Sequence, residues 1–223
     1  MKNALRLSVP VILSVLAFGA SVPLALAATP GNVVINEFSS GTASDWVELR
    51  NTTGDSIDLT GWKLTDLTTP DTTPTEADKL ALSGTISAGD VLAFDVSGLN
   101  NSGDSIGLYD NSGTPVLIDR VTYGTVAGVD YPVTLGLGTE PATQEYAFKD
   151  ATGSWHIVTF NTKGSANLEI TNGSTYYPTI QEAIDAASSG DTINVAAGTY
   201  DEQLTVDKDI RFKERNKRLS AWN

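Results

Sequence analysis

Val33-Val34-Ile35-Asn36-Glu37-Phe38 is the stretch that decides the fold class of this chain. It is a β-branched run, and the next run, Trp46-Val47-Glu48-Leu49-Arg50, alternates apolar and polar residues as a half-buried strand does. Similar short runs follow at Ile57–Leu59, Trp62–Thr65, Val91–Phe94, Ser105–Tyr109 and Val116–Tyr123. No helical periodicity competes with them up to about Trp155, so the pattern predicts an all-β sandwich.

Turn-forming residues separate these runs. Glycine combines with Asp, Asn, Ser or Thr in 53–55, 87–90, 101–104 and 111–113, and such residues supply the positive φ angles that tight connections need. Residues 66–79 are different, because they form a long, polar stretch that two prolines punctuate. A loop of this length is either functional or a tolerated insertion, and we favour the insertion.

The first residues have the order of features of a secretory signal. Lys2 and Arg6 give a positive start, an apolar stretch follows, and Ala25-Leu26-Ala27 is a small-x-small cleavage site. We therefore predict a signal peptide over residues 1–27 and a mature chain, beginning at Ala28, that is secreted or held at the cell surface. An uncleaved anchor helix is the alternative, but two prolines interrupt the apolar stretch.

Composition limits the partners and the chemistry. The 223 residues include 14 Lys and Arg and 27 Asp and Glu, for a net charge of −13. Removal of residues 1–27 takes away two basic residues and no acidic one, so the mature charge is 12 − 27 = −15. Because such a chain repels phosphates and anionic membrane surfaces, we expect no nucleic-acid partner, and no membrane span after signal cleavage. The absence of cysteine excludes disulfides, thiol chemistry and thiolate zinc sites.

A series of ordered motifs runs along residues 32–168. They are Val34–Glu37, Asp45–Leu49, Asp58–Leu64, Gly84–Asp90, Asn101–Asp110, Ile118–Gly124, Gly153–Trp155 and Thr162–Asn167. Together they resemble the lamin tail domain family, which usually has proline where this chain has Lys163. The resemblance implies an Ig-like sandwich over residues 28–168. In bacterial exported proteins it implies an accessory module attached to another domain, and not a catalytic fold.

Four residues within these motifs have a structural explanation. Asn36 and Glu48 are polar positions in otherwise apolar strands, so each needs a hydrogen-bond partner if it is buried. Gly61 has the place of a turn glycine that lets the large side chain of Trp62 enter the core. We favour these structural roles over a ligand site.

After residue 168 the pattern changes to a short helix followed by strands. The apolar residues of one helix face are spaced i, i+3, i+4, i+7, at Ile180, Ala183, Ile184 and Ala187. Thr179 and Glu182 predict a capping box at the start of this helix, and Gly190 is expected to close it. Strands are predicted at Thr192–Val195 and Leu204–Val206.

A second resemblance, to another family, rests on four short motifs: Thr179–Ile184, Gly190–Ile193, Gly198–Tyr200 and Val206–Ile210. Because of these motifs, residues 169–210 resemble the N-terminal cap and first coil of a right-handed parallel β-helix of the pectate-lyase kind. A solenoid needs about three repeats for stability, and this segment supplies roughly one. Residues 211–223 depart from that family as an atypical basic tail, which we interpret as a truncation or a reading-frame shift rather than a natural tail.

Candidate chemistry is sparse, and we predict no catalytic, cofactor-binding or metal site. The single histidine, His156, has no motif around it, so a surface or half-buried strand residue is favoured over a general base. No Gly-x-Ser-x-Gly elbow, P-loop or dinucleotide glycine pattern occurs in the sequence. Calcium is the one metal worth weighing, since 101–104 and 110–113 place oxygen ligands beside glycines, but neither segment follows EF-hand spacing.

Two hypotheses of function follow. The favoured one is a non-catalytic exported module of a secreted or cell-surface protein, which binds a protein or a surface polymer such as a glycan. The alternative is the truncated N-terminal part of a secreted polysaccharide-active enzyme with a pectate-lyase-like β-helix. That resemblance implies catalytic residues on later coils, so this chain is expected not to be an enzyme under either hypothesis.

Overall fold

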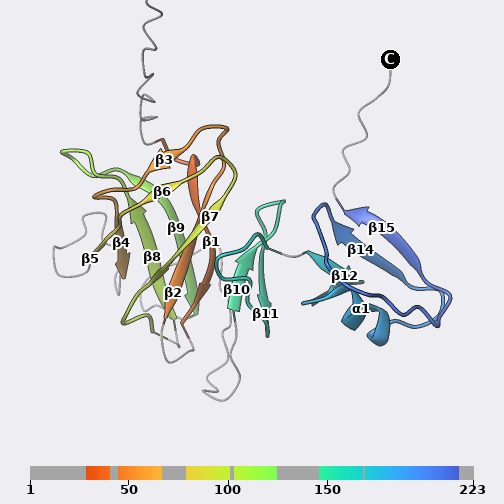
Figure 1. The fold of residues 1–223 in the computed structure, drawn as a ribbon. Helices are drawn as coiled ribbons and strands as arrows, with labels where there is room; N and C mark the ends of the chain where they lie inside the picture. Colours follow the sequence, from red (N-terminus) through yellow and green to blue (C-terminus); the bar gives the residue numbers. More distant parts are fainter. Residues whose placement is uncertain are drawn as a thin grey trace, which may run out of the picture.

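The computed structural model describes residues 29–40, 45–66, 79–100, 103–124, 146–167 and 169–215. The predicted signal peptide and residues 67–78 of the predicted loop lie outside the described residues. Within the described ranges the regular structure is almost entirely β-strand, with one short helix (Figure 1). The prediction of an all-β fold is confirmed.

Two antiparallel sheets form an Ig-like sandwich. The first sheet has the order β11-β10-β1-β2-β7, and the second has the order β5-β4-β8-β9. The strands of the first sheet are β1 (Val33–Ser39), β2 (Trp46–Asn51), β7 (Val91–Asp95), β10 (Tyr146–Lys149) and β11 (Trp155–Val158). Those of the second are β4 (Lys63–Asp66), β5 (Lys79–Ala81), β8 (Gly103–Tyr109) and β9 (Leu117–Gly124). A small pair, β3 (Ile57–Asp58) and β6 (Thr85–Ile86), lies beside them.

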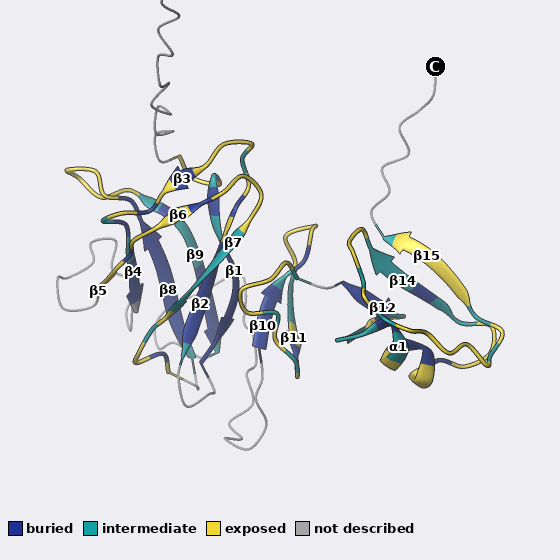
Figure 2. Cartoon of the chain, viewed as in Figure 1, coloured by how far each residue is buried: buried dark blue, intermediate teal, exposed yellow. Residues whose placement is uncertain are grey.

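The main core lies between the two sheets, and both supply it from alternate positions of their strands. Ile35, Val47 and Leu49 enter it from the first sheet. Leu64 and Leu108 enter it from the second sheet, and Figure 2 shows these central strands as buried. A fully buried side chain of this size contributes roughly 1.5–3 kcal/mol to folding, so this layer is the main source of stability of the sandwich.

Gly61 and Trp62 have the roles that the sequence predicts. Gly61 has a φ of 80°, and a Cβ at this position would come within 3.3 Å of the Asn111 Cβ. The following side chain, Trp62, is 3% exposed and belongs to the main core. The glycine therefore permits the turn that aims the indole inward.

A β-bulge at Asn36 changes which face the β1 side chains reach. The pairing of β1 with β2 shifts between Ile35 and Glu37, so that Ile35 faces Leu49 and Glu37 faces Glu48. The extra residue puts Asn36 on the same side as Glu37, opposite the core face. Strict alternation would have directed Asn36 and Glu37 to opposite faces.

Several strands differ from the sequence prediction. The runs β5, β6 and β10 were not expected, because β5 and β6 are only two or three residues long and β10 contains no β-branched residue. Their pairing is decided by neighbours, since β10 lies between β1 and β11 in the first sheet. Tertiary context therefore supplies what local propensity does not.

The C-terminal unit is a third sheet with a helix packed on it. Its strand order is β13-β12-β14-β15, with β12 (Ile170–Asn172), β13 (Thr175–Tyr177), β14 (Thr192–Ala196) and β15 (Arg211–Arg215). Helix α1 (Ile180–Ala186) buries Ile180, Ala183 and Ile184 against Ile170 and Ile193. The predicted helix face is confirmed. No helix in the described part of the chain is both long and apolar enough to cross a membrane.

The helix ends earlier than predicted, and a distant segment adds hydrogen bonds at both of its ends. Thr179 accepts a hydrogen bond from the Glu182 amide at 3.1 Å, which is one half of the predicted capping box; the reciprocal bond to the Glu182 carboxylate is not among the hydrogen bonds of the described residues. The C-cap, however, is Ala187 and not Gly190. The ammonium of Lys208 lies at this end of the helix, where it donates to the carbonyl oxygens of Ile184 and Ala187 at 3.1 and 2.9 Å.

The second predicted strand, Leu204–Val206, is wrong. Its backbone pairs with a side chain instead of a strand, since the Thr205 amide donates to Gln181 Oε1 at 2.8 Å. Three residues before Thr205, Glu202 accepts from the amides of Ile180 and Gln181 at the start of α1. Segment 201–208 thus runs along α1 and caps both of its ends.

The strand that follows β14 is β15, which the sequence assigns to an atypical tail. β15 pairs with β14 in parallel, with Thr192 opposite Arg211 and Ala196 opposite Arg215. The first five residues of segment 211–223 are therefore strand, and the tail prediction is wrong for them. Every residue of β15 except Phe212 is charged, so the segment lacks the alternation of a half-buried strand. Both faces of β15 are largely exposed, and Phe212 itself is 49% exposed.

Candidate functional site

Polar side chains cover the outer face of the first sheet, on the side opposite the main core. The group, which we call the outer-face cluster, consists of Asn36, Glu37, Glu48, Thr162, Gly164 and Asn167. Its first three members lie on β1 and β2, and the others lie in the segment that follows β11. The cluster therefore fixes residues 162–167 to the sheet.

The Glu48 carboxylate has a hydrogen-bond donor on each oxygen. Oε1 accepts from Asn36 Nδ2 at 2.8 Å, and Oε2 accepts from the Gly164 amide at 2.6 Å. The Asn36 amide group also donates to Asn167 Oδ1 at 3.0 Å. Asn36 and Glu48 are 3% and 0% exposed, so the expectation that each has a partner when buried is confirmed.

Glu37 and Asn167 both place an oxygen beside the hydroxyl group of Thr162, which has only one proton to donate. Oε1 accepts from the Thr162 amide at 3.0 Å, and Oε2 lies 2.6 Å from the Thr162 hydroxyl. That hydroxyl is also 3.1 Å from Asn167 Oδ1, but it has only one proton to donate. A proton on Glu37 satisfies both contacts, because Glu37 then donates to Thr162 and Thr162 donates to Asn167.

The electrostatics of the two carboxylates agree with this arrangement. Burial raises the pKa of Glu37 to about 7, the two hydrogen bonds from Thr162 oppose the rise, and the nearby Glu48 carboxylate adds to it. Burial also raises the pKa of Glu48, against the hydrogen bonds from Asn36 and Gly164. Of the pair, Glu37 has the partner to which it donates when protonated, and Glu48 has only donors around it.

The motifs from Val34–Glu37 to Ile118–Gly124, which resemble the lamin tail domain, lie along strands β1 to β9 and the turn at Gly61. Residues 27–125 match the family model of the Lamin Tail Domain. This family is an Ig-like, non-catalytic type of module. A search of curated proteins finds no match to the chain.

The matched lamin-tail region ends just after β9, but the first sheet does not. Strands β10 and β11 and the segment 162–167 come later in the chain, and β10 pairs directly with β1. Phe38 on β1 packs against Tyr123 on β9 and Trp155 on β11, with ring centroids 4.9 and 5.5 Å apart. The sandwich of this chain therefore uses residues on both sides of position 125, where the match ends.

A second polar group joins the sandwich to the C-terminal unit. It consists of Asp150, His156, Glu169, Tyr176 and Arg215, which we call the junction cluster. His156 Nε2 lies 3.0 Å from Asp150 Oδ2 and 3.1 Å from the Tyr176 hydroxyl. Arg215 on β15 lies 3.3 Å from both Asp150 Oδ2 and Glu169 Oε2.

Asp150 is the centre of the junction cluster. Its Oδ1 accepts from the Thr152 amide and hydroxyl and from the Ser154 amide, at 2.6–3.0 Å. Burial favours the neutral acid, but these hydrogen bonds and the one with His156 outweigh it and hold the pKa of Asp150 below its usual range. The ionised Asp150 is therefore the anion that the Arg215 guanidinium meets.

Apolar contacts accompany the junction cluster. Phe148, Tyr146 and Trp46 form a small apolar cluster on the outer face of the first sheet. Tyr176 of the C-terminal unit packs edge-on against Phe148, with ring centroids 5.1 Å apart. The guanidinium of Arg215 lies over the Tyr176 ring at 5.3 Å. Tyr176 thus connects the apolar and the ionic parts of the junction.

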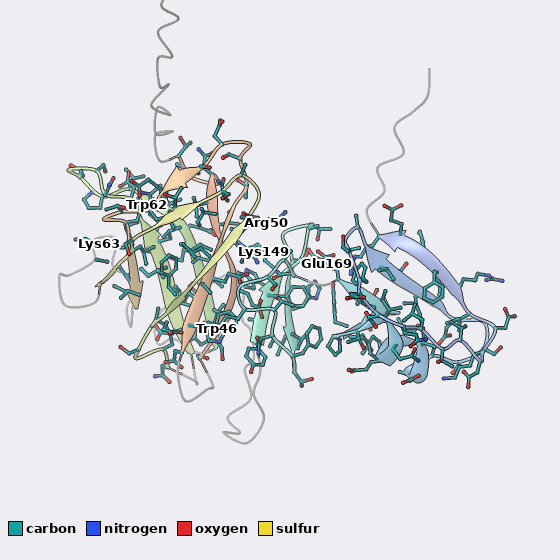
Figure 3. The ribbon with its side chains drawn as sticks, viewed as in Figure 1. Trp46, Arg50, Trp62, Lys63, Lys149 and Glu169 are labelled. Atoms are coloured by element: carbon teal, nitrogen blue, oxygen red, sulfur yellow. The ribbon has the colours of Figure 1, made fainter. Side chains whose placement is uncertain are left out.

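A cavity of about 250 Å³ opens beside the junction cluster. It is lined from the sandwich by Asn36, Arg50, Lys149 and Asn167, from the C-terminal unit by Ala196, Ala197 and Arg215, and by Glu169 between them. In Figure 3, Arg50 and Lys149 lie one above the other at the edge of the sandwich, and Glu169 lies between them and the C-terminal unit. Three cationic side chains therefore line one cavity of a chain whose net charge is −13, although Lys149 is paired with Asp119 and Arg215 with Asp150 and Glu169.

We predict that Arg215→Met loosens the C-terminal unit and leaves the sandwich intact. The change removes the ion pairs with Asp150 and Glu169, whose carboxylates lie in poorly exposed side chains. Because Arg215 itself is partly exposed, we expect a loss of about 1–2 kcal/mol in local stability, or roughly tenfold faster amide exchange in β12. Arg211→Met, on the same strand but exposed, is the control. Equal exchange in the two variants would show that the junction does not depend on Arg215.

The residues singled out from the sequence lie in different places. His156 is a half-buried strand residue, as expected, with a side chain 29% exposed. In the 110–113 segment, Asp110 Oδ1 accepts from the amides of Ser112 and Val116, and in the other, Asp104 Oδ2 accepts from the Asn100 amide. Residues 101 and 102 lie outside the described ranges. Among the described residues no group of three or more His, Cys, Asp or Glu is placed to hold a metal ion.

Sequence reasoning missed Arg50, Asp150, Glu169 and Arg215. They come from four separate parts of the chain, and no motif links them. A weak signal exists for Arg50, since it follows Leu49 at an outward position of an alternating strand. Arg215 offers none, because its segment reads as a basic tail.

Proposed function

We propose that this chain is an exported, non-catalytic module that binds a protein or a surface polymer through the cavity between its sandwich and its C-terminal unit. The cavity with three cationic side chains, on a chain of strongly negative net charge, is the observation that carries the proposal. The lamin-tail match supports the non-catalytic part, because it belongs to a non-catalytic type of module. The signal-like N-terminus supports export.

The test uses the chain expressed with residues 1–27 and purified from the culture medium. We expect mass spectrometry to find Ala28 as its first residue, and the protein to sediment with isolated bacterial cell envelopes. Sugar reducing ends in the same incubations should stay at the level of the protein-free control. Protein that stays in the supernatant of every envelope preparation would contradict a binding module. Release of reducing ends would contradict its non-catalytic character.

The alternative is the N-terminal part of a secreted polysaccharide-active enzyme with a parallel β-helix. It is favoured by the parallel pairing of β14 with β15, in which residue 192 faces residue 211 after a step of 211 − 192 = 19 residues. A parallel pair joined without an intervening helix is what one coil of a solenoid provides. The discriminating observation is the downstream nucleotide sequence, since an open frame that continues the coils beyond Ile210 would identify the parent protein.

A further inference from the structure

The segment that follows β11, residues 162–167, is held to the first sheet by two buried carboxylates. The Thr162 amide donates to Glu37 Oε1 at 3.0 Å, and the Gly164 amide donates to Glu48 Oε2 at 2.6 Å. Glu37 and Glu48 are 1% and 0% exposed, whereas residues 163–166 are exposed. No residue of the segment belongs to an apolar cluster of the described structure, so polar contacts attach it to the sheet.

The same segment forms part of the wall of the cavity beside the junction cluster, which we call the junction cavity. Asn167 and Asn36 both line it, and Asn36 Nδ2 donates to Asn167 Oδ1 at 3.0 Å. Asn167 Nδ2 donates to the Lys149 carbonyl oxygen at 2.9 Å, and Glu169, two residues later, lines the cavity as well. The position of the segment therefore sets the position of this wall.

A proton on Glu37 decides whether the hydrogen bonds of the segment can all be made. When Glu37 is neutral, it donates to the Thr162 hydroxyl, and that hydroxyl donates to Asn167 Oδ1. When Glu37 is ionised, the single hydroxyl proton serves either Glu37 or Asn167 and not both. Two carboxylates then also meet in the same buried cluster, because Glu37 is opposite Glu48 in the pairing of β1 with β2.

The charged neighbours of Glu37 in the described structure do not balance its ionised form. Glu48 faces it from β2, and its neighbour on β10 is the apolar Phe148. From the segment, the Lys163 ammonium is directed to Asp95 Oδ1, at 2.6 Å. Burial raises the pKa of Glu37 to about 7, and the Glu48 carboxylate adds to the rise, so the proton is lost near neutral pH.

We propose that Glu37 is a pH-dependent latch, which fixes residues 162–167 to the first sheet while it is protonated and releases them when it ionises. Release moves the wall that Asn167 and Asn36 give to the junction cavity. The latched state is fully favoured below the ordinary carboxyl pKa of 4.5 and is lost as the pH rises through the raised pKa of about 7. The latch needs no ligand, so it does not rest on the proposed function.

Amide hydrogen exchange of the mature chain, followed by NMR at pH 5.5 and pH 8, tests the latch. Protection factors correct for the intrinsic pH dependence of exchange, and at the Thr162 and Gly164 amides they should fall at least about tenfold between the two pH values. The amides of β4 and β8 in the second sheet are the internal reference and should keep their protection. The side-chain amide resonance of Asn167 reports the cavity wall and should shift over the same pH range.

Three variants assign the change to one residue. Glu37→Gln cannot ionise, so at pH 8 its two amides should keep the protection that they have at pH 5.5. Asp95→Asn removes an exposed carboxylate that contacts the same segment through Lys163, and it should behave as the parent does. His156→Gln removes the single imidazole of the chain, a group that ordinarily changes charge near neutral pH, and it should also behave as the parent does.

Three results would each overturn the latch. They are equal protection of the parent at both pH values, a Glu37→Gln variant that keeps the parent's pH dependence, and a His156→Gln variant that loses it. If Glu37→Gln does not fold, the parent alone still decides. Loss of protection in the second sheet together with Thr162 and Gly164 would then show general unfolding in place of a latch.

Discussion

Replacement of Glu37 by glutamine is expected to stabilise the protein at pH 8 and to change little at pH 4.5. Burial raises the pKa of Glu37 from 4.5 to about 7, so the folded state holds this proton more tightly than the unfolded chain does. The stabilisation is complete below the unfolded pKa of 4.5 and is lost as the pH rises through about 7. At pH 8 the folded protein therefore carries an unfavourable buried charge, which glutamine removes.

The difference between 4.5 and about 7 corresponds to up to roughly 3 kcal/mol, at 1.4 kcal/mol for each pH unit. Glutamine keeps the local bonds, because its oxygen accepts from the Thr162 amide and its amide group donates to the Thr162 hydroxyl. Urea unfolding of the mature chain at both pH values, followed by tryptophan fluorescence, measures the difference. A variant that is less stable than the parent at pH 8 would contradict a proton on Glu37.

The same substitution at Glu48 is expected to have the opposite sign. Both oxygens of Glu48 accept hydrogen bonds, from Asn36 Nδ2 and from the Gly164 amide. The amide group of a glutamine would face one of these donors, and Asn36 cannot invert to accept, because its amide group also donates to Asn167. We expect Glu48→Gln to lose about 2–3 kcal/mol at pH 8, since one buried donor is left without an acceptor.

Each glutamine variant is the control for the other, because the two positions face each other across β1 and β2 and are equally buried. Glu48→Gln also removes the neighbouring charge that helps to raise the pKa of Glu37. Its unfolding free energy should therefore depend less on pH between 4.5 and 7 than that of the parent. If Glu48→Gln stabilised the protein and Glu37→Gln destabilised it, the proton would reside on Glu48.

The sequence predicts the sandwich well because its strands are decided locally. Alternation at Trp46–Arg50 and the turn glycine before Trp62 each need only a few neighbouring residues to be recognised. The partnership of Asn36 and Glu48 follows in outline, since polar residues in apolar strands require partners. The role of Glu37 is not predicted, because the bulge that puts Asn36 and Glu37 on the same face of the sheet is a property of strand pairing and not of composition.

The C-terminal unit shows why the remainder resists prediction. Leu204–Val206 has the composition of a strand, but the side chain of Gln181 takes the place of a partner strand for Thr205. Arg215 reads as part of a basic tail, but its meaning comes from Asp150 and Glu169, which lie far from it in sequence. Contacts of this kind are set by how distant segments meet, and no local pattern records them.

The capping of α1 also has a consequence for the order in which the chain acquires structure. A helix of seven residues is too short to persist in water by itself. Glu202 satisfies its first amides, and Lys208 satisfies its last carbonyls. During synthesis from the N-terminus, these residues emerge after the helix itself. The sandwich strands are made first, whereas α1 waits for Lys208 and for β15 to arrive, so the C-terminal unit is assembled as one late event.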